Sequence, residues 1–260
     1  MKHHHLIFLA LLAGVQPVFA ETAEEKGYAI QAEASRRDNG FADSMHDAIM
    51  TLRNAQGAVS TREFVVKTLE VEGDGDKEMG IFHSPADVRG TAVLTFSHGT
   101  QPDDQWIYLP SLKRVKRIAT VNKSGPFVGS EFAFEDISSW ELEKYRYRHL
   151  RDEVLDGDAT FVIENIPVYE HSGYTRQIEW LDQEMYQPRK IEFYDRKGAL
   201  LKTLTFSDYQ QYLGRYWRAG KLRMENHQNG KNTELLRQNY RFGNGFREMD
   251  FTENALRNVR

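Results

Sequence analysis

Short turns spaced about ten residues apart are the feature of this chain that most restricts its fold. From residue 60 onward, pieces rich in Gly, Asp, Asn and Pro separate short runs of β-branched and apolar residues. Residues 156–158, 195–198 and 229–230 have the composition of hairpin turns. Parallel strands need crossover connections of about a dozen residues or more, and these connections are too short for that. The sequence therefore predicts one large antiparallel sheet.

The predicted strands share short length and a β-branched or alternating pattern. In one of them Ala92, Leu94 and Phe96 fall on a single face. The strands are predicted at residues 61–72, 79–83, 91–96, 106–109, 115–120, 147–155, 160–168, 174–180, 190–194, 200–206, 212–226 and 233–242.

Helices are predicted mainly before the first of these strands. Residues 24–37 are rich in Ala, Glu and Arg and favour a polar helix, and short helices are predicted near residues 138–144 and 253–258. Phe41, Met45, Ile49 and Leu52 recur at helical spacing, which predicts an amphipathic helix over residues 41–56. Such a helix would cover one face of the sheet, so the fold class is α+β, with helices in the concavity of a curved sheet.

The first twenty residues have the pattern of a secretory signal. A short cationic stretch precedes the apolar residues 6–15, and Val18 and Ala20 supply the small residues of a cleavage site. Ten apolar residues are about half of what a membrane-spanning helix needs, and no later stretch is long enough. We predict a signal peptide at residues 1–20, cut after Ala20, and a single domain at residues 21–260 in the periplasm.

Composition and motifs exclude several kinds of chemistry. The chain has no Cys, which removes disulfides, thiol catalysis and a lipid-bearing cysteine. Acidic residues outnumber basic ones, 38 to 34, which argues against a nucleic-acid partner. No histidine pair has the i, i+4 spacing of a helical zinc site, and G-x-S-x-G and P-loop motifs are absent. We therefore predict no catalytic residue, metal or cofactor; a hydrolase triad assembled from distant segments stays as the alternative.

A basic run and a set of aromatic residues are the candidates for binding. Lys113, Arg114, Lys116 and Arg117 would project from both faces of a strand, which is incompatible with a lipid-facing strand. They are predicted either to contact head groups or an acidic partner, or to protect an exposed sheet edge. The aromatic candidates either fill the core or line a cavity for an apolar ligand; they are Trp106, Tyr108, Phe127, Phe132, Phe134 and Trp180.

Two stretches resemble a known family. DQWIYLPSLKRVKRI at residues 104–118 and FVGSEFAFEDI at residues 127–137 are similar to the signature of LolA-like outer membrane lipoprotein-sorting proteins. Residues 51–57, 82–90 and 250–256 extend the likeness along the chain. The resemblance implies a periplasmic protein with an incomplete antiparallel β-barrel of about eleven strands, lined by apolar side chains and lidded by helices. The branch it resembles is often found beside RND/MMPL-type exporters, which implies an inner-membrane transporter as partner.

The resulting hypothesis is a carrier or chaperone rather than an enzyme. Lipids or lipoprotein acyl chains would bind in an apolar cavity for transfer toward the outer membrane, with peripheral contact to the membrane surface. The helix at residues 41–56 and the loop at residues 121–136 would shift to admit them. Alternatives are a periplasmic lipid hydrolase that uses the same cavity and an accessory subunit of an RND-type exporter.

Overall fold

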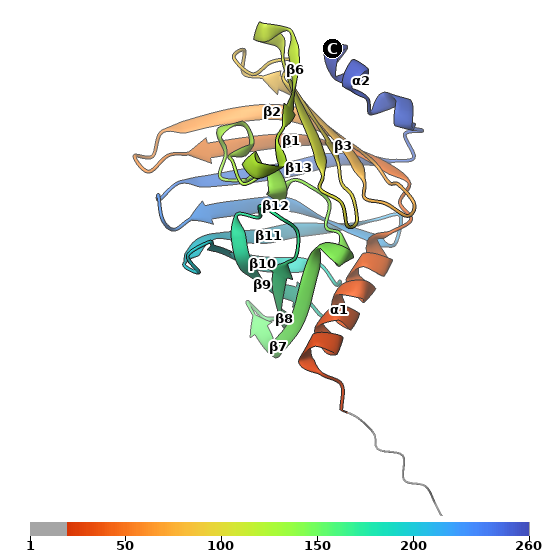
Figure 1. The fold of residues 1–260 in the computed structure, drawn as a ribbon, viewed down its shortest axis with the longest axis vertical. Helices are drawn as coiled ribbons and strands as arrows, with labels where there is room; N and C mark the ends of the chain where they lie inside the picture. Colours follow the sequence, from red (N-terminus) through yellow and green to blue (C-terminus); the bar gives the residue numbers. More distant parts are fainter. Residues whose placement is uncertain (1–19, 260) are drawn as a thin grey trace, which may run out of the picture.

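The computed structural model describes residues 20–259, so the predicted signal peptide, apart from Ala20, lies outside the described residues. The chain forms one curved antiparallel sheet of thirteen strands (Figure 1). The strands are β1 Asp43–Arg53, β2 Val59–Leu69, β3 Lys77–Ser84, β4 Ala92–Phe96, β5 Asp104–Leu109, β6 Arg114–Ile118, β7 Tyr145–Leu155, β8 Asp158–Pro167, β9 Tyr174–Asp182, β10 Pro188–Asp195, β11 Leu200–Tyr212, β12 Tyr216–Asn226 and β13 Asn232–Phe242.

The strand order shows two meanders joined along one seam. The order is β6-β5-β4-β3-β2-β1-β13-β12-β11-β10-β9-β8-β7, and every neighbouring pair is antiparallel. The seam is the β1–β13 pair, which joins the two ends of the chain's sheet-forming part. Because β6 and β7 are the edges, the sheet stays open. This confirms the predicted incomplete barrel, with thirteen strands instead of about eleven.

The amphipathic helix predicted at residues 41–56 is wrong, because this stretch is strand β1. Its burial alternates: Ser44, His46, Ala48 and Met50 are buried, and the residues between them are half-buried. Both edges of β1 are hydrogen-bonded, to β2 and to β13. A helix here would leave those two strands without partners, and unpaired backbone groups in the middle of a sheet are costly. Tertiary pairing therefore overrides the helical spacing of a few apolar residues.

The N-terminal helix α1 spans Ala23–Asp38, close to the predicted residues 24–37. Thr22 caps it: its hydroxyl accepts from the Glu25 N–H at 3.1 Å, and the Glu25 carboxylate accepts from the Thr22 N–H at 2.9 Å. The helix lies along edge strand β7 (Figure 1). At its C-terminal end Arg215 donates to the backbone carbonyls of Arg36 and Asn39. The helix thus bridges β7 to the turn before β12.

Helix α1 can approach β7 closely because it carries a glycine at the contact. A Cβ added at Gly27 would lie 2.8 Å from the His149 backbone nitrogen and 2.9 Å from that of Arg148. Gly27→Ala is therefore expected to destabilise the fold by about 1–3 kcal/mol, even though alanine favours helix. The measurement is urea unfolding. Ala29→Gly, at an exposed position of the same helix, measures how much the difference in helix propensity between Ala and Gly contributes to stability. A Gly27→Ala variant more stable than the wild type would contradict the close packing.

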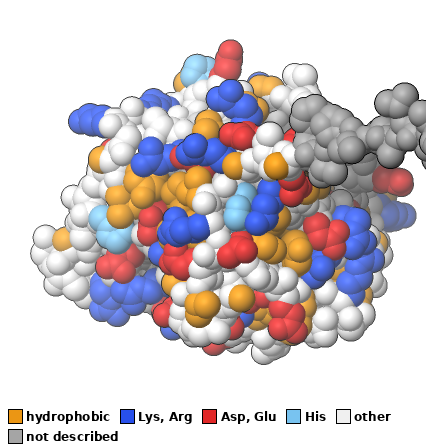
Figure 2. All heavy atoms as spheres, turned by 90° about the horizontal axis from the view of Figure 1, so that it is seen from below, with side chains coloured by type: hydrophobic (Ala, Val, Ile, Leu, Met, Phe, Trp, Pro, Cys, Tyr) orange, Lys and Arg blue, Asp and Glu red, His pale blue; other side chains and the backbone are white. Residues whose placement is uncertain are grey.

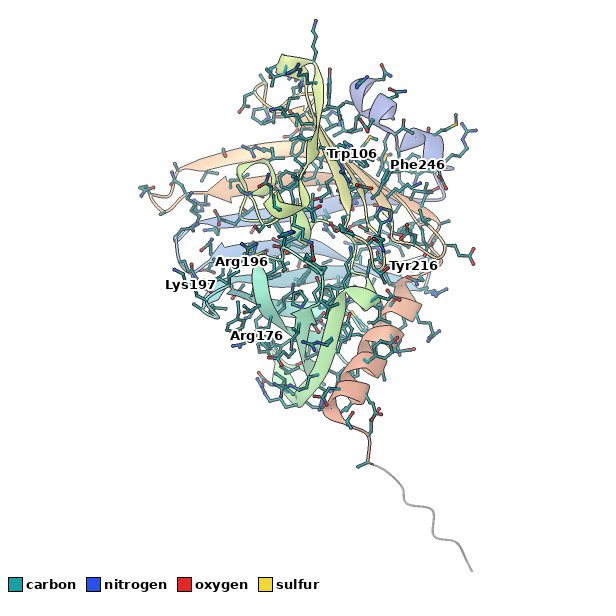
Figure 3. The ribbon with its side chains drawn as sticks, viewed as in Figure 1. Trp106, Arg176, Arg196, Lys197, Tyr216 and Phe246 are labelled. Atoms are coloured by element: carbon teal, nitrogen blue, oxygen red, sulfur yellow. The ribbon has the colours of Figure 1, made fainter. Side chains whose placement is uncertain are left out.

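A short helix, α2 at Glu253–Arg257, covers the other side of the sheet, as predicted for residues 253–258. Phe251 and Leu256 pack there against Met79, Ile81 and Leu94. Figure 3 shows Trp106 and Phe246 near this helix, and both belong to the same apolar cluster. The β3–β5 region therefore has apolar side chains on both faces.

Residues 119–144, here called the crossing segment, connect the two edges of the sheet. The segment leaves β6, passes over the concave face and enters β7, with four short 3₁₀ turns along its course. Its Phe127, Phe132 and Phe134 belong to the main apolar cluster, which also contains Phe64 and Leu222 from the sheet. Only the last of the four turns, Leu142–Lys144, falls in the helix predicted at residues 138–144. The concave face is therefore covered mainly by this irregular segment, with α1 at one end.

Candidate ligand cavity

A cavity of about 990 Å³ lies between the concave face of the sheet, the crossing segment and the C-terminal half of α1. This volume is at the upper end of the range for small-molecule sites. The lining includes the end of α1, the turn between β2 and β3, and residues from the crossing segment.

Neither helix in residues 20–259 has the length and apolar character that a membrane span requires.

One part of the cavity wall is apolar and aromatic. Phe64 on β2 and Phe127 of the crossing segment line it, and both pack against the buried Phe82, at 4.7 Å and 6.0 Å between ring centroids. Met50, Leu222 and Leu235 continue this surface across β1, β12 and β13. These side chains face inward because inward and outward positions alternate along each strand.

Another part of the wall is charged, and its negative and positive side chains come from different strands. Glu70, Glu72, Asp74, Asp76 and Glu78 line the cavity from the β2–β3 turn and the start of β3. Arg215, Arg218 and Arg237 line it from the region of β12 and β13. Figure 3 shows Tyr216 at this end of the molecule, near α1, while Arg196 and Lys197 lie at the opposite end. The cavity is therefore amphipathic, with an apolar floor and a charged end.

The carboxylates at the charged end are hard to ionise. Burial raises the pKa of Asp76 to about 7, and the neighbouring Glu141 and Glu70 add to the effect. Burial also raises the pKa of Glu78 to about 7, against a lowering contribution from Arg237. The imidazole of His46 has its pKa held well below the usual range by burial and by Arg237 and Arg218. Below about pH 7 the two carboxyl groups thus favour their neutral forms, and the lowered pKa of His46 favours its neutral ring, because burial penalises each charged form.

The crossing segment is anchored over the apolar floor by buried polar contacts. The Lys202 ammonium donates to the Asp136 carboxylate at 2.6 Å and to the Glu131 carbonyl at 3.0 Å. The Tyr174 hydroxyl donates to the same carboxylate of Asp136 at 2.7 Å. The side chains of Lys202 and Asp136 are 4% and 3% exposed. These contacts disfavour the predicted shift of residues 121–136.

Glu135 and Lys144 hold the rest of the segment. The Glu135 carboxylate accepts from the Gly173 N–H at 2.8 Å and from the Ser172 hydroxyl at 3.0 Å. Lys144 forms a buried ion pair with Asp103. Glu135 thus binds the loop between β8 and β9, whereas Asp136 binds Lys202 of β11 and Tyr174 of β9.

The structure places the six predicted aromatic residues in different surroundings. Phe127 and Phe132 line the cavity, and Phe134 packs edge-on against Phe127 at 5.7 Å. Trp106 and Tyr108 lie on the opposite face of β5, in the cluster beneath α2. These two residues therefore do not line the cavity, because positions 105 and 107 are the inward ones of β5.

Trp180 also lies away from the cavity. It shares a face of β9 with Arg176 and Ile178, while Gln177 and Glu179 of the same strand line the cavity. Its ring lies under the Lys190 ammonium at 3.5 Å, and its indole N–H donates to Glu153 at 3.2 Å. Trp180 therefore contributes to the convex face and not to the cavity wall.

Most of the basic run lies on edge strand β6, and Lys113 immediately precedes that strand. Lys113, Arg114, Lys116 and Arg117 are all exposed, and Arg117 pairs with Asp104 of β5. Their role, as a contact surface or as protection of a sheet edge, stays a prediction. The molecule seen from below in Figure 2 mixes positive, negative and hydrophobic side chains on one face.

The residues at the charged end of the cavity were not predicted as site residues from the sequence. His46 lies in the stretch predicted as a helix, and Glu78 and Arg237 are far apart along the chain. Period-2 alternation in β1 and β13 would have placed His46 and Arg237 on the inward faces. Their proximity follows only from the pairing of β1 with β13, where Ala48 is opposite Arg237.

Histidine contacts and possible metal ligands bear on the alternative of a hydrolase. Within residues 20–259, no group of three His, Asp or Glu side chains can hold a metal ion. Hydrogen bonds to histidine rings in this part of the chain join His98 to Asp74, His149 to Asp152 and His227 to Thr203. The His227–Thr203 pair joins an imidazole to a hydroxyl group, but it is exposed and neither residue lines the cavity.

Comparison with known proteins supports the same fold and family. A family model described only as "Uncharacterized protein" matches residues 74–258, and a search of curated proteins finds no match. The structure of a Vibrio parahaemolyticus domain named as an outer membrane lipoprotein-sorting protein domain is 57% identical, with a TM-score of 0.89. The match covers 90% of this chain and 99% of that one.

Two further structures are similar over most of the chain. A DUF1329 family protein from Desulfovibrio piger is 29% identical, with a TM-score of 0.87, and the match covers 90% of this chain and 99% of that one. A LolA superfamily protein from Nitrosomonas europaea is 22% identical, with a TM-score of 0.71, and the match covers 91% and 100%. The last likeness concerns the fold alone. Given the Vibrio match and the family model over residues 74–258, the chain belongs to the same family as the Vibrio outer membrane lipoprotein-sorting protein domain.

Proposed function

We propose that this protein is a periplasmic carrier that binds lipids or lipoprotein acyl chains in the cavity for transfer toward the outer membrane. The observation that carries the proposal is the large cavity with an apolar floor on the concave face of an open sheet. Family membership and the name of the Vibrio domain support it. In this role the protein is a non-enzymatic chaperone for hydrophobic cargo.

Binding is driven by removing acyl chains from water. Each CH₂ group that leaves water for the apolar floor contributes about 0.8 kcal/mol before the costs of association. The entrance is the charged end, where α1, the β2–β3 turn and residues 138–141 meet around the cavity. Release requires a receptor that binds the cargo more tightly, since handover follows the difference in affinity. An inner-membrane RND/MMPL-type transporter remains the proposed donor or partner, and edge strand β6 the proposed contact with it or with head groups.

Filling the cavity should abolish cargo binding. Ala219 is buried on β12 and lines the cavity, so Ala219→Phe places a ring in the space that an acyl chain would occupy. We expect at least tenfold weaker binding of a fluorescent fatty acid to delipidated protein. Ala159→Phe, at an exposed position of β8, is the matched control and should bind as the wild type does.

The proposal has a direct test in native mass spectrometry. Protein purified without detergent from its own host should carry bound lipid, and the Ala219→Phe variant should carry much less. Absence of lipid from both, together with no fatty-acid binding, would contradict a carrier. Hydrolysis of the lipid by pure protein would instead support an enzyme.

A further inference from the structure

The cavity wall contains buried polar atoms that no other described residue satisfies. His46 is 6% exposed, and its Nδ1 atom has no hydrogen-bond partner within the described chain. The Nε atom of Arg237 is buried and unpartnered in the same way. Gln177 is 3% exposed, and its Oε1 atom also lacks a partner among residues 20–259. All three residues line the cavity.

Unsatisfied buried polar atoms are uncommon, and each costs free energy. Arg237 forms no ion pair within the described residues, although it lies near enough to Glu78 to lower the pKa of that carboxyl group. A guanidinium with an unsatisfied N–H beside a cavity offers a binding site to an anion. The other two arginines at this end have partners in the protein: Arg218 forms an ion pair with Asp38, and Arg215 donates to backbone carbonyls.

Glu78 supplies a charge of the opposite sign to Arg237 in the cavity wall. Glu78 on β3 and Arg237 on β13 are separated along the sheet by β2 and β1, and Arg237 is opposite Ala48 of β1. Glu78 faces Thr68 of β2, and Thr68 faces Ser44 of β1, so two hydroxyl groups follow Glu78 along its row of the sheet. Asp76 and Glu78 form no ion pair with any described cation, and burial is the largest cause of the raised pKa of each carboxyl group.

We propose that this end of the cavity is a subsite for a zwitterionic head group, with its phosphate at Arg237 and His46 and its ammonium at Glu78 and Asp76. The inference rests on the proposed carrier function and names its cargo class: a phospholipid-type amphiphile whose acyl chain lies on the apolar floor. The Arg237 guanidinium supplies donors for phosphate oxygens, and the neutral His46 ring supplies one N–H donor. The carboxylates of Glu78 and Asp76 supply acceptors for the ammonium group.

The test compares three single-chain lipids with the same acyl chain, used below their micelle concentrations in titration calorimetry. They are a lysophosphatidylethanolamine, a lysophosphatidylglycerol and a monoacylglycerol. The wild type should bind the first at least tenfold more tightly than the last. Arg237→Gln should remove this preference by weakening the binding of the two phospholipids at least tenfold more than the binding of monoacylglycerol. Glu78→Gln should reduce only the preference for lysophosphatidylethanolamine over lysophosphatidylglycerol.

Two controls separate recognition from folding. Arg223→Gln, at an exposed position of β12, should bind all three lipids as the wild type does. Arg237→Gln should melt at the same temperature as the wild type or higher, because it removes a half-buried cation that forms no ion pair within the described residues. A lower melting temperature would mark Arg237 as structural, and Arg237→Lys, which keeps the charge, would then have to retain the phosphate preference for the subsite to stand.

Each outcome has a distinct meaning. Equal binding of all three lipids by the wild type overturns the head-group subsite but leaves the carrier function in place. Equal binding of the two phospholipids, with no effect of Glu78→Gln, overturns the ammonium half of the site. No binding of any lipid contradicts the proposed function itself.

Discussion

Replacing Lys202 with methionine is expected to lower the free energy of unfolding by about 3–5 kcal/mol, because the Asp136 carboxylate stays buried without its cation. Lys202 is the one charged contact of this carboxylate within the described chain, and the pair ties the crossing segment to β11. Urea unfolding of the purified protein measures the loss.

The surface pair between Lys221 and Glu234 provides the matched control for this substitution. The two side chains are 38% and 31% exposed, so Lys221→Met should cost less than about 1 kcal/mol. The double variant Lys202→Met with Asp136→Asn should recover part of the loss, since no charge is then left unpaired.

The same variant, studied by hydrogen exchange, tests what holds the crossing segment over the cavity. In Lys202→Met, amide hydrogen exchange in residues 119–144 should become faster than in the sheet, as expected of a locally opening unit. A Lys202→Met variant as stable as Lys221→Met, with unchanged exchange, would show that the buried pair does not anchor the segment.

The second large effect is a dependence of stability on pH that comes from the charged end of the cavity. Glu78 has its pKa raised from 4.5 to about 7, and Asp76 from 3.8 to about 7. Between about pH 4.5 and pH 7 the folded protein therefore holds protons that the unfolded chain has released. Their contribution to stability is favourable at low pH and is lost as pH rises toward 7.

Glu78→Gln removes a carboxyl group that is unfavourable when ionised. Relative to the wild type, the variant should gain about 2.5 kcal/mol in unfolding free energy between pH 5 and pH 8, because each pH unit between the unfolded and the folded pKa of Glu78 changes the stability by about 1.4 kcal/mol. The measurement is urea unfolding of both proteins at four pH values across this range. Glu225→Gln, at an exposed position of β12, controls for the loss of one carboxyl group. A constant difference between wild type and Glu78→Gln across this range would contradict the raised pKa.

Local signals explain what could be predicted of the fold. The conformation of turns such as residues 195–198 is determined by the residues of the turn itself, and neighbouring antiparallel strands need only short connections. Helix α1 was predictable because its capping residues and its helix-forming composition are contiguous. In β1 the local signal was misleading: apolar residues at helical spacing coexist with the period-2 burial of a central strand.

The cavity could be predicted only in outline. Phe127 and Phe132 were identified because aromatic residues in a glycine-containing loop near a curved sheet point to an apolar interior. Trp106 and Trp180 were assigned to the same site because sequence does not say which face of a strand is concave. In a sheet with apolar clusters on both faces, the alternation pattern is the same for either choice.

The sequence by itself determined the antiparallel meanders, the N-terminal helix and the family, because these depend on residues that lie close together along the chain. Only the tertiary structure decided that β1 joins the two meanders, that residues 119–144 are anchored over the concave face, and that Glu78, His46 and Arg237 line one end of a cavity. The physical reason is sequence separation: strands at the two ends of the chain pair at the seam. That pairing and the curvature of the sheet bring together charges that no local pattern connects.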